Sequence, residues 1–137
     1  MCSSDLQSRY AAGLMLYLAE GSKNDLYAIA LANTDPRIIK FFIAWVEEFL
    51  DIPKAKLKFE LHLYLTMDIA KEVKFWRDEL RIKESQFYKH QVQSLKKTSF
   101  IYRESFRHGT CSVRYSNSEK KQELSVAIKA FRDSFLK

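Results

Sequence analysis

The stretch KLKFELHLYLT, residues 56–66, alternates apolar and polar side chains without a break. Successive side chains of a β-strand point to opposite faces, so this pattern predicts a strand with one buried and one solvent-facing side. The apolar side carries Leu57, Phe59, Leu61, Leu63 and Leu65, and the polar side carries Lys56, Lys58, Glu60, His62 and Tyr64. A strand of this kind belongs to a sheet that helices cover on one face only.

Amphipathic segments on both sides of this strand supply the helices and the remaining strands. Thr34 or Asp35, and Asp68, are suitable N-caps, and Pro36 suits a first helical turn. We expect helices over 7–20, 36–50, 68–80 and 117–137, and further strands over 26–32, 86–95 and 109–116. This order predicts an α+β domain over residues 7–137, with a mostly antiparallel sheet under helices.

Composition limits the class of protein. Hydrophobic residues make up 47% of the 137 residues, enough to bury a core. The apolar runs are too short to cross a bilayer, and no secretory signal pattern precedes them, so we expect a cytoplasmic protein without a membrane partner. Cys2 and Cys111 provide neither a disulfide framework nor a paired-thiol zinc site. Residues 1–6, MCSSDL, resemble the translation of a sequencing-adapter DNA, and we expect them to be a non-native start.

The net charge of +6 is concentrated between Ser85 and Ser118. The basic residues of this segment are Lys89, Lys96, Lys97, Arg103, Arg107 and Arg114, and its one acid is Glu104. Basic segments of this kind usually bind a polyanion such as nucleic acid. The alternative is a solvated surface whose counter-charges come from elsewhere in the fold.

The polar face of the predicted sheet carries side chains that can contact DNA. Lys and Arg bind phosphates or guanine, and Gln pairs with adenine. The predicted DNA-binding residues are Lys56, Lys58, His62, Gln91, Gln93, Arg107, Ser112 and Arg114. The alternative is an ordinary solvent face, since exposed strand positions are commonly polar. His62, His90 and His108 have no zinc-site spacing, and we expect each at the surface or in a groove.

The first predicted helix ends in an acid, Glu20, directly before Gly21. A carboxylate at a helix C-terminus is unfavourable by about 0.3–1 kcal/mol, because the carbonyl end of the helix carries partial negative charge. We expect Gly21 to stop the helix in the left-handed conformation. Small residues seven apart, such as Ala12 and Ala19, would allow a second helix to approach closely.

A second copy of the chain is the expected partner of this helix, through an interface of Ala12, Gly13, Leu16 and Ala19. Two-fold symmetry would bring the two Glu20 carboxylates together. Oxygen ligands of this kind bind hard divalent cations such as Mg²⁺. The sequence therefore predicts a homodimer with a Mg²⁺ site at Glu20, which would account for the position of the acid.

The helix GLMLYLAEG, residues 13–21, resembles the signature helix of the LAGLIDADG homing endonucleases. The resemblance continues through LANTDPRIIKFFIAWV, FWRDEL, SQFYKHQV and GTCSVRY, and it covers about residues 7–137. It implies a saddle-shaped sheet, a homodimer and metal-dependent double-strand cuts in DNA. The catalytic residues would be Glu20 as the metal ligand and Lys96 or Lys97 beside the attacking water. Two positions depart from the family's motif. Met15 stands where the family has an internal glycine, and Leu18 stands where the family has an acid before the final one.

A non-cleaving DNA-binding transcriptional regulator with the same fold is the alternative. Some relatives of the fold resemble bacterial regulators that kept the saddle and lost the chemistry, often beside a helix-turn-helix. An upstream helix-turn-helix missing from this chain would fit that interpretation. The third possibility is an unrelated α+β binding module.

Overall fold

The computed structural model describes residues 3–23, 25–88, 91–93 and 108–136. These residues form the helices α1 (Ser3–Glu20), α2 (Pro36–Leu50), α3 (Ile69–Leu80) and α4 (Ser118–Phe135), and the strands β1 (Ala28–Asn33), β2 (Lys58–Tyr64), β3 (Gln91–Gln93) and β4 (Thr110–Ser116). Two short 3₁₀ helices, η1 (Lys54–Lys56) and η2 (Glu84–Gln86), connect them. The predicted α+β class is confirmed.

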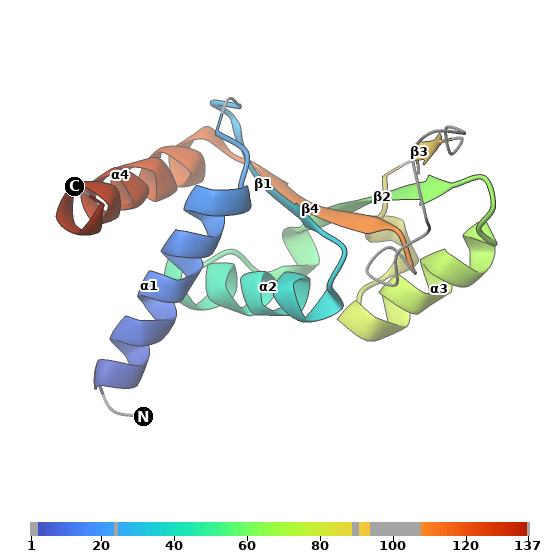
Figure 1. Cartoon of the computed structure of the whole chain (residues 1–137), viewed down its shortest axis with the longest axis horizontal. Helices are drawn as coiled ribbons and strands as arrows, with labels where there is room; N and C mark the ends of the chain where they lie inside the picture. The colour runs from blue at the N-terminus through green and yellow to red at the C-terminus, as the bar shows by residue number, and fades with distance from the viewer. Residues whose placement is uncertain (1–2, 24, 89–90, 94–107, 137) are drawn as a thin grey trace.

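The strands form one sheet in the order β1-β4-β2-β3. Strand β4 is antiparallel to both β1 and β2, whereas β3 runs parallel to β2. Helices α2 and α3 lie on one side of this sheet, α1 packs beside α2, and α4 continues from the end of β4 (Figure 1). The strand predicted over 86–95 is present in the described residues only as β3, after the short helix η2.

Side-chain caps begin three of the helices. The Asp35 carboxylate accepts from the backbone N–H of Arg37, with Pro36 in the first turn, and the Asp68 carboxylate accepts from the backbone N–H of Lys71. The Asn117 side chain accepts from the backbone N–H of Lys120 at the start of α4. Each cap satisfies one of the backbone N–H groups that a helix leaves without an internal partner. The predicted caps Asp35 and Asp68 are confirmed.

The core lies between the apolar face of the sheet and the helices. Leu57, Phe59, Leu61 and Leu63 are all buried, as their alternation predicted. The prediction for Leu65 is wrong, because the strand ends at Tyr64 and the following turn leaves Leu65 66% exposed. From the helices, the large side chains of Trp76, Phe42 and Trp45 are buried in the same core.

The end of α1 differs from the expected left-handed glycine stop. Gly109 is the one glycine of the described chain with a positive φ, so Gly21 does not take that conformation. Instead, Gly21 pairs with Leu31 at the outer edge of β1, and the Ser22 N–H donates to the Ala30 carbonyl. A Cβ atom on Gly21 would lie 2.5 Å from the Tyr17 ring, so the absence of a side chain is needed for this packing.

Candidate nucleic-acid interface

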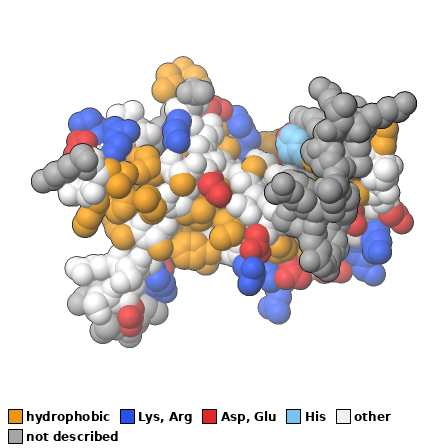
Figure 2. Space-filling model, viewed as in Figure 1, with side chains coloured by type: hydrophobic (Ala, Val, Ile, Leu, Met, Phe, Trp, Pro, Cys, Tyr) orange, Lys and Arg blue, Asp and Glu red, His pale blue; other side chains and the backbone are white. Residues whose placement is uncertain are grey.

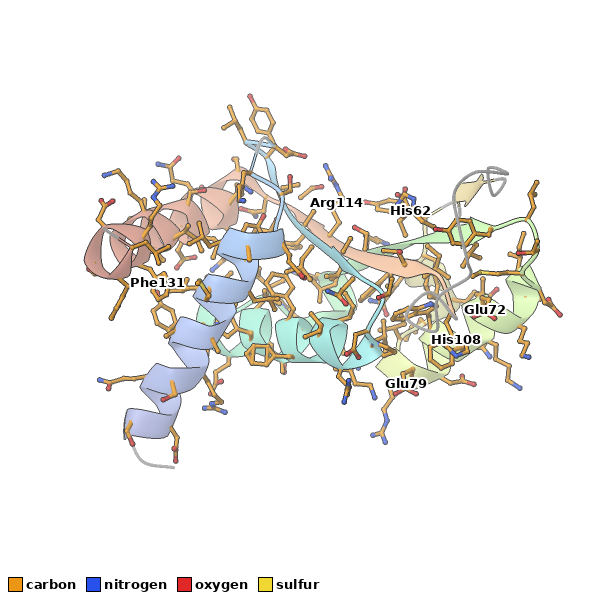
Figure 3. The ribbon with its side chains drawn as sticks, in the orientation of Figure 1. His62, Glu72, Glu79, His108, Arg114 and Phe131 are labelled. Atoms are coloured by element: carbon orange, nitrogen blue, oxygen red, sulfur yellow. The ribbon has the colours of Figure 1, made fainter. Side chains whose placement is uncertain are left out.

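The polar face of the sheet brings together four of the predicted DNA-binding residues. Arg114 of β4 lies opposite Lys58 of β2, and His62 of β2 lies opposite Thr110. Ser112 lies between Thr110 and Arg114 on the same face of β4. Figure 3 shows Arg114 and His62 on the side of the sheet away from α2 and α3. The residues therefore share one open surface, which we call the open face.

The other predicted DNA-binding residues lie in different places. Lys56 is exposed but belongs to η1, before β2 begins. Gln91 and Gln93 occupy register positions beside His62 and Tyr64, at the outer strand of the sheet. Arg107, and the predicted catalytic lysines Lys96 and Lys97, lie outside the described residues.

Two acidic residues lie beside polar and basic side chains of the open face. The Asp25 carboxylate, before β1, lies 2.7 Å from the Arg114 guanidinium, and Glu60 lies 3.0 Å from the His62 ring nitrogen. The backbone N–H of Tyr27, and then the Arg114 guanidinium, hold the pKa of the Asp25 carboxyl below its ordinary value. For Arg114 the counter-charge thus comes from elsewhere in the fold, as the solvated-surface alternative expects.

Glu20 ends α1 at the border of the open face. Its side chain is exposed, and its carboxylate accepts one hydrogen bond, at 2.7 Å, from the side-chain amide of Asn33 in β1. Among the described residues Glu20 takes part in no ion pair, so the acid remains uncompensated at the negative end of the helix. A cation from solution could therefore bind to this carboxylate.

A shallow hollow of about 220 Å³ lies next to Glu20. Its other walls include Ala30 and Ala32 of β1 and Ser112 of β4, which are small side chains of the open face. Because no large side chain rises from these positions, a ligand on the open face can come close to the strands beside Glu20. This combination of small residues and one carboxylate is a suitable place for a phosphate group and a cation.

Between Arg9 and Glu20, the side of α1 that points away from the core carries no charge. Ala12, Met15 and Ala19 are exposed there, and Leu16 is half-buried. A helix that is apolar all round is normally covered on all sides. Figure 2 shows hydrophobic side chains gathered over the part of the molecule where α1, α2 and α4 lie. This uncharged side of α1, which we call its outer face, is suited to contact another helix.

Gly13 does not belong to the outer face. It is buried against α2, where an added Cβ atom would lie 2.1 Å from Nε1 of Trp45. The Trp45 indole N–H donates to the backbone carbonyls of Arg9 and Tyr10, at 3.1 and 3.2 Å. The assignment of Gly13 to a dimer interface is therefore corrected: the glycine makes room for Trp45 within one chain.

Sequence reasoning missed a buried acid–imidazole pair. Glu72 of α3 is 6% exposed and lies 2.7 Å from Nδ1 of His108, whose ring stacks on Phe75 (Figure 3). The His108 side chain is 27% exposed, so it lies partly at the surface while it pairs with Glu72 and packs on Phe75. The spacing of Glu72 with Val73 and Trp76 on the inner side of α3 was the available signal for a buried carboxylate.

A second missed residue is Lys121, which is 5% exposed. Its ammonium donates to the Tyr17 hydroxyl and to the Ser22 carbonyl, and so ties α4 to the end of α1. Lys121 precedes Leu124 and Ile128 at helical spacing, which places it on the inner side of α4 and could have revealed its burial.

Within the described residues, no three His, Cys, Asp or Glu side chains lie close enough together to hold a metal ion. A metal ion at Glu20 would therefore have this one carboxylate from each chain. No helix in the described part of the chain has the length and apolar character to span a membrane.

Comparison with known proteins found no matching family model, no similar curated protein and no similar solved structure.

Proposed function

We propose that the chain is a DNA-binding protein of the LAGLIDADG type, which acts as a homodimer and makes Mg²⁺-dependent double-strand cuts. The observation that carries the proposal is the place of Glu20. This carboxylate is exposed, lies at the end of an apolar helix and borders a hollow of small residues on the open face. A saddle-shaped sheet that continues across two copies is part of the same proposal.

The residues around Glu20 suit the approach of a phosphodiester. Ala30, Ala32 and Ser112 leave room above the strands, and Lys58 supplies positive charge on the same face, where Arg114 is paired with Asp25. Mg²⁺ prefers oxygen ligands and is commonly bound through one or two carboxylates together with substrate phosphates. When bound, such an ion activates water and stabilises the leaving oxygen.

The second carboxylate would come from a second copy of the chain. The outer face of α1 supports this, because Ala12 and Ala19 are small and exposed, and Leu16 lies beside them. Two copies that join through this face would bring the two α1 helices, and their terminal Glu20 residues, toward one axis. Lys96 and Lys97 remain the proposed catalytic lysines.

Glu20→Gln tests the proposal, since it keeps the size of the side chain and removes its charge. The wild type should cut members of a random duplex library with Mg²⁺ at discrete sites. The variant should bind the same duplexes and cut them more slowly by a factor of about 10² or more. Glu123→Gln is the matched control: Glu123 is an exposed acid of α4, 54% accessible, that does not line the hollow beside Glu20, and its loss should leave cutting unchanged.

Each other outcome has a definite meaning. Full cutting by the Glu20→Gln variant would remove Glu20 from the metal site. Specific binding by the wild type without any cutting would favour the non-cleaving regulator. A wild type that sediments as a monomer at micromolar concentration, with or without DNA, would contradict the homodimer.

A further inference from the structure

A basic pocket lies between the end of α1 and α4, and it shares one lining residue, Ser22, with the hollow beside Glu20. Its volume is about 300 Å³. Four of its lining residues are basic, namely Lys23, Lys121, Lys129 and Arg132, and no Asp or Glu lines it. A concave site with one sign of charge concentrates counter-ions, so the lining alone favours an anion.

Lys121 gives the pocket a buried positive charge. The side chain is 5% exposed, and its ammonium donates to two neutral oxygens, the Tyr17 hydroxyl at 2.8 Å and the Ser22 carbonyl at 2.5 Å. It also lies 5.0 Å from the centre of the Tyr17 ring. Among the described residues no carboxylate forms an ion pair with it. Buried charges are normally paired, because removal from water is costly.

The nearby acids do not supply this counter-charge. The Lys121 charge is the weakest of the causes that lower the pKa of Asp25. The Asp25 carboxylate is instead paired with the Arg114 guanidinium, at 2.7 Å. Asp133 pairs with Lys129 at 3.3 Å, but it lies on the exposed side of α4 and does not line the pocket. Lys23 and Arg132 form no ion pair with any residue that the structure describes. The pocket therefore has an excess of positive charge.

We propose that this pocket binds a small phosphate monoester. Lys121 would contact the phosphate at the inner end, and Lys23 and Arg132 would contact it from the rim. The dianionic phosphate offers several acceptor oxygens, which matches ammonium and guanidinium donors. Leu18 and Ile128 form an apolar part of the lining, against which the carbon skeleton of the ligand would pack. Since Lys121 is nearly buried, a terminal phosphate can reach it and the backbone phosphate of a duplex cannot.

The test uses the full chain and two probes, inorganic phosphate and AMP, with sulfate as a matched anion. Calorimetry and thermal unfolding should both show saturable binding, and AMP should bind more tightly than phosphate. The double variant Lys23→Gln, Arg132→Gln should weaken AMP binding by about tenfold or more. The control variant Lys71→Gln, Lys74→Gln removes the same charge from exposed positions of α3 and should bind AMP as the wild type does.

Three results would overturn the proposal. The first is the absence of saturable binding of phosphate and AMP at about 10 mM, where a weak specific site would fill. The second is an affinity of the double variant for AMP equal to that of the wild type. The third is an equal affinity of the wild type for sulfate and AMP. Lys121→Met is a second variant, which should abolish the effect of AMP on the melting temperature if it folds. The proposal is independent of the proposed function: DNA cutting by the double variant should equal that of the wild type, and loss of DNA activity would leave AMP binding intact.

Discussion

Gly13→Ala tests how α1 is held against α2. The added Cβ atom would lie 2.1, 2.2 and 2.3 Å from three atoms of the Trp45 indole, where ordinary contacts are about 3.4–4 Å. The indole must therefore move by more than an ångström. Its surroundings resist this movement, because Trp45 is 2% exposed and stacks on Tyr10 and Phe42 at 5.9 and 6.1 Å.

The expected change combines two losses and one gain. Overpacking of a tight contact costs about 1–3 kcal/mol. Displacement of the indole N–H from the Arg9 and Tyr10 carbonyls costs about 1 kcal/mol. Replacement of Gly by Ala inside a helix stabilises the helix by about 1 kcal/mol, because Ala has the higher helix propensity. Gly13→Ala should thus lower the free energy of unfolding by about 1–3 kcal/mol, which is a fall in melting temperature of about 3 °C for each kcal/mol.

Urea unfolding, followed by tryptophan fluorescence at several protein concentrations, measures this change separately from self-association. Ala12→Leu is the control, because Ala12 is exposed on the outer face of α1, whereas Gly13 is buried. We expect this control to change the stability of the dilute chain by less than about 0.5 kcal/mol and to weaken the proposed dimer. A Gly13→Ala variant as stable as the wild type would refute the reasoning, since helix propensity would then outweigh the contact with Trp45.

Two further predictions concern charges of the open face. Lys58→Gln should reduce the slope of log affinity for duplex DNA against log salt by about 0.9, because Lys58 forms no ion pair with a described residue and would release a counter-ion on binding. Arg114→Gln should reduce this slope by less, since Asp25 already neutralises Arg114; equal changes would contradict the role of the ion pair. Because its pKa is lowered, the ionised Asp25 carboxyl stabilises the fold at neutral pH, and this contribution is lost as the pH falls through the lowered pKa. Arg114→Gln should raise this pKa only in part, as measured by carboxyl NMR, because the hydrogen bond from the Tyr27 N–H, the largest single cause, remains; a wild-type pKa at or above the ordinary value would disprove the assignment.

Alternation in residues 56–66 was a reliable guide to the sheet. A shift by one residue would expose every apolar side chain of β2, so the burial of Leu57, Phe59, Leu61 and Leu63 follows from the pattern alone. The pattern does not say where the strand ends, because an apolar residue in the next turn continues it. Leu65 is the example: it follows the last residue of β2 and lies in the solvent.

The orientation of α1 was beyond the sequence, because the helix is apolar on both sides. Periodicity gives one preferred inner side only when the other side is polar. The contact that decides the orientation joins Gly13 to Trp45, which lies on another helix. The ion pair of Asp25 with Arg114 joins residues 89 positions apart, and no local pattern marks it. Lys121 is different, since its spacing with Leu124 already indicated the inner side of α4.

The two sides of α1 together explain why its acid stands at the end. On the inner side, Trp45 packs against Gly13, and Tyr17 is tied through its hydroxyl to the Ser22 carbonyl and to Lys121. These contacts fix the height of Glu20 above the sheet within one chain. In the proposed dimer the outer face would fix the distance between two copies of Glu20. Between Arg9 and Glu20 the helix carries no charge, and in the proposed dimer each of its sides would be packed against another helix. Glu20, the last residue of α1, is exposed and lines the hollow on the open face, and in the proposed dimer the binding of a divalent cation would offset the unfavourable helix dipole.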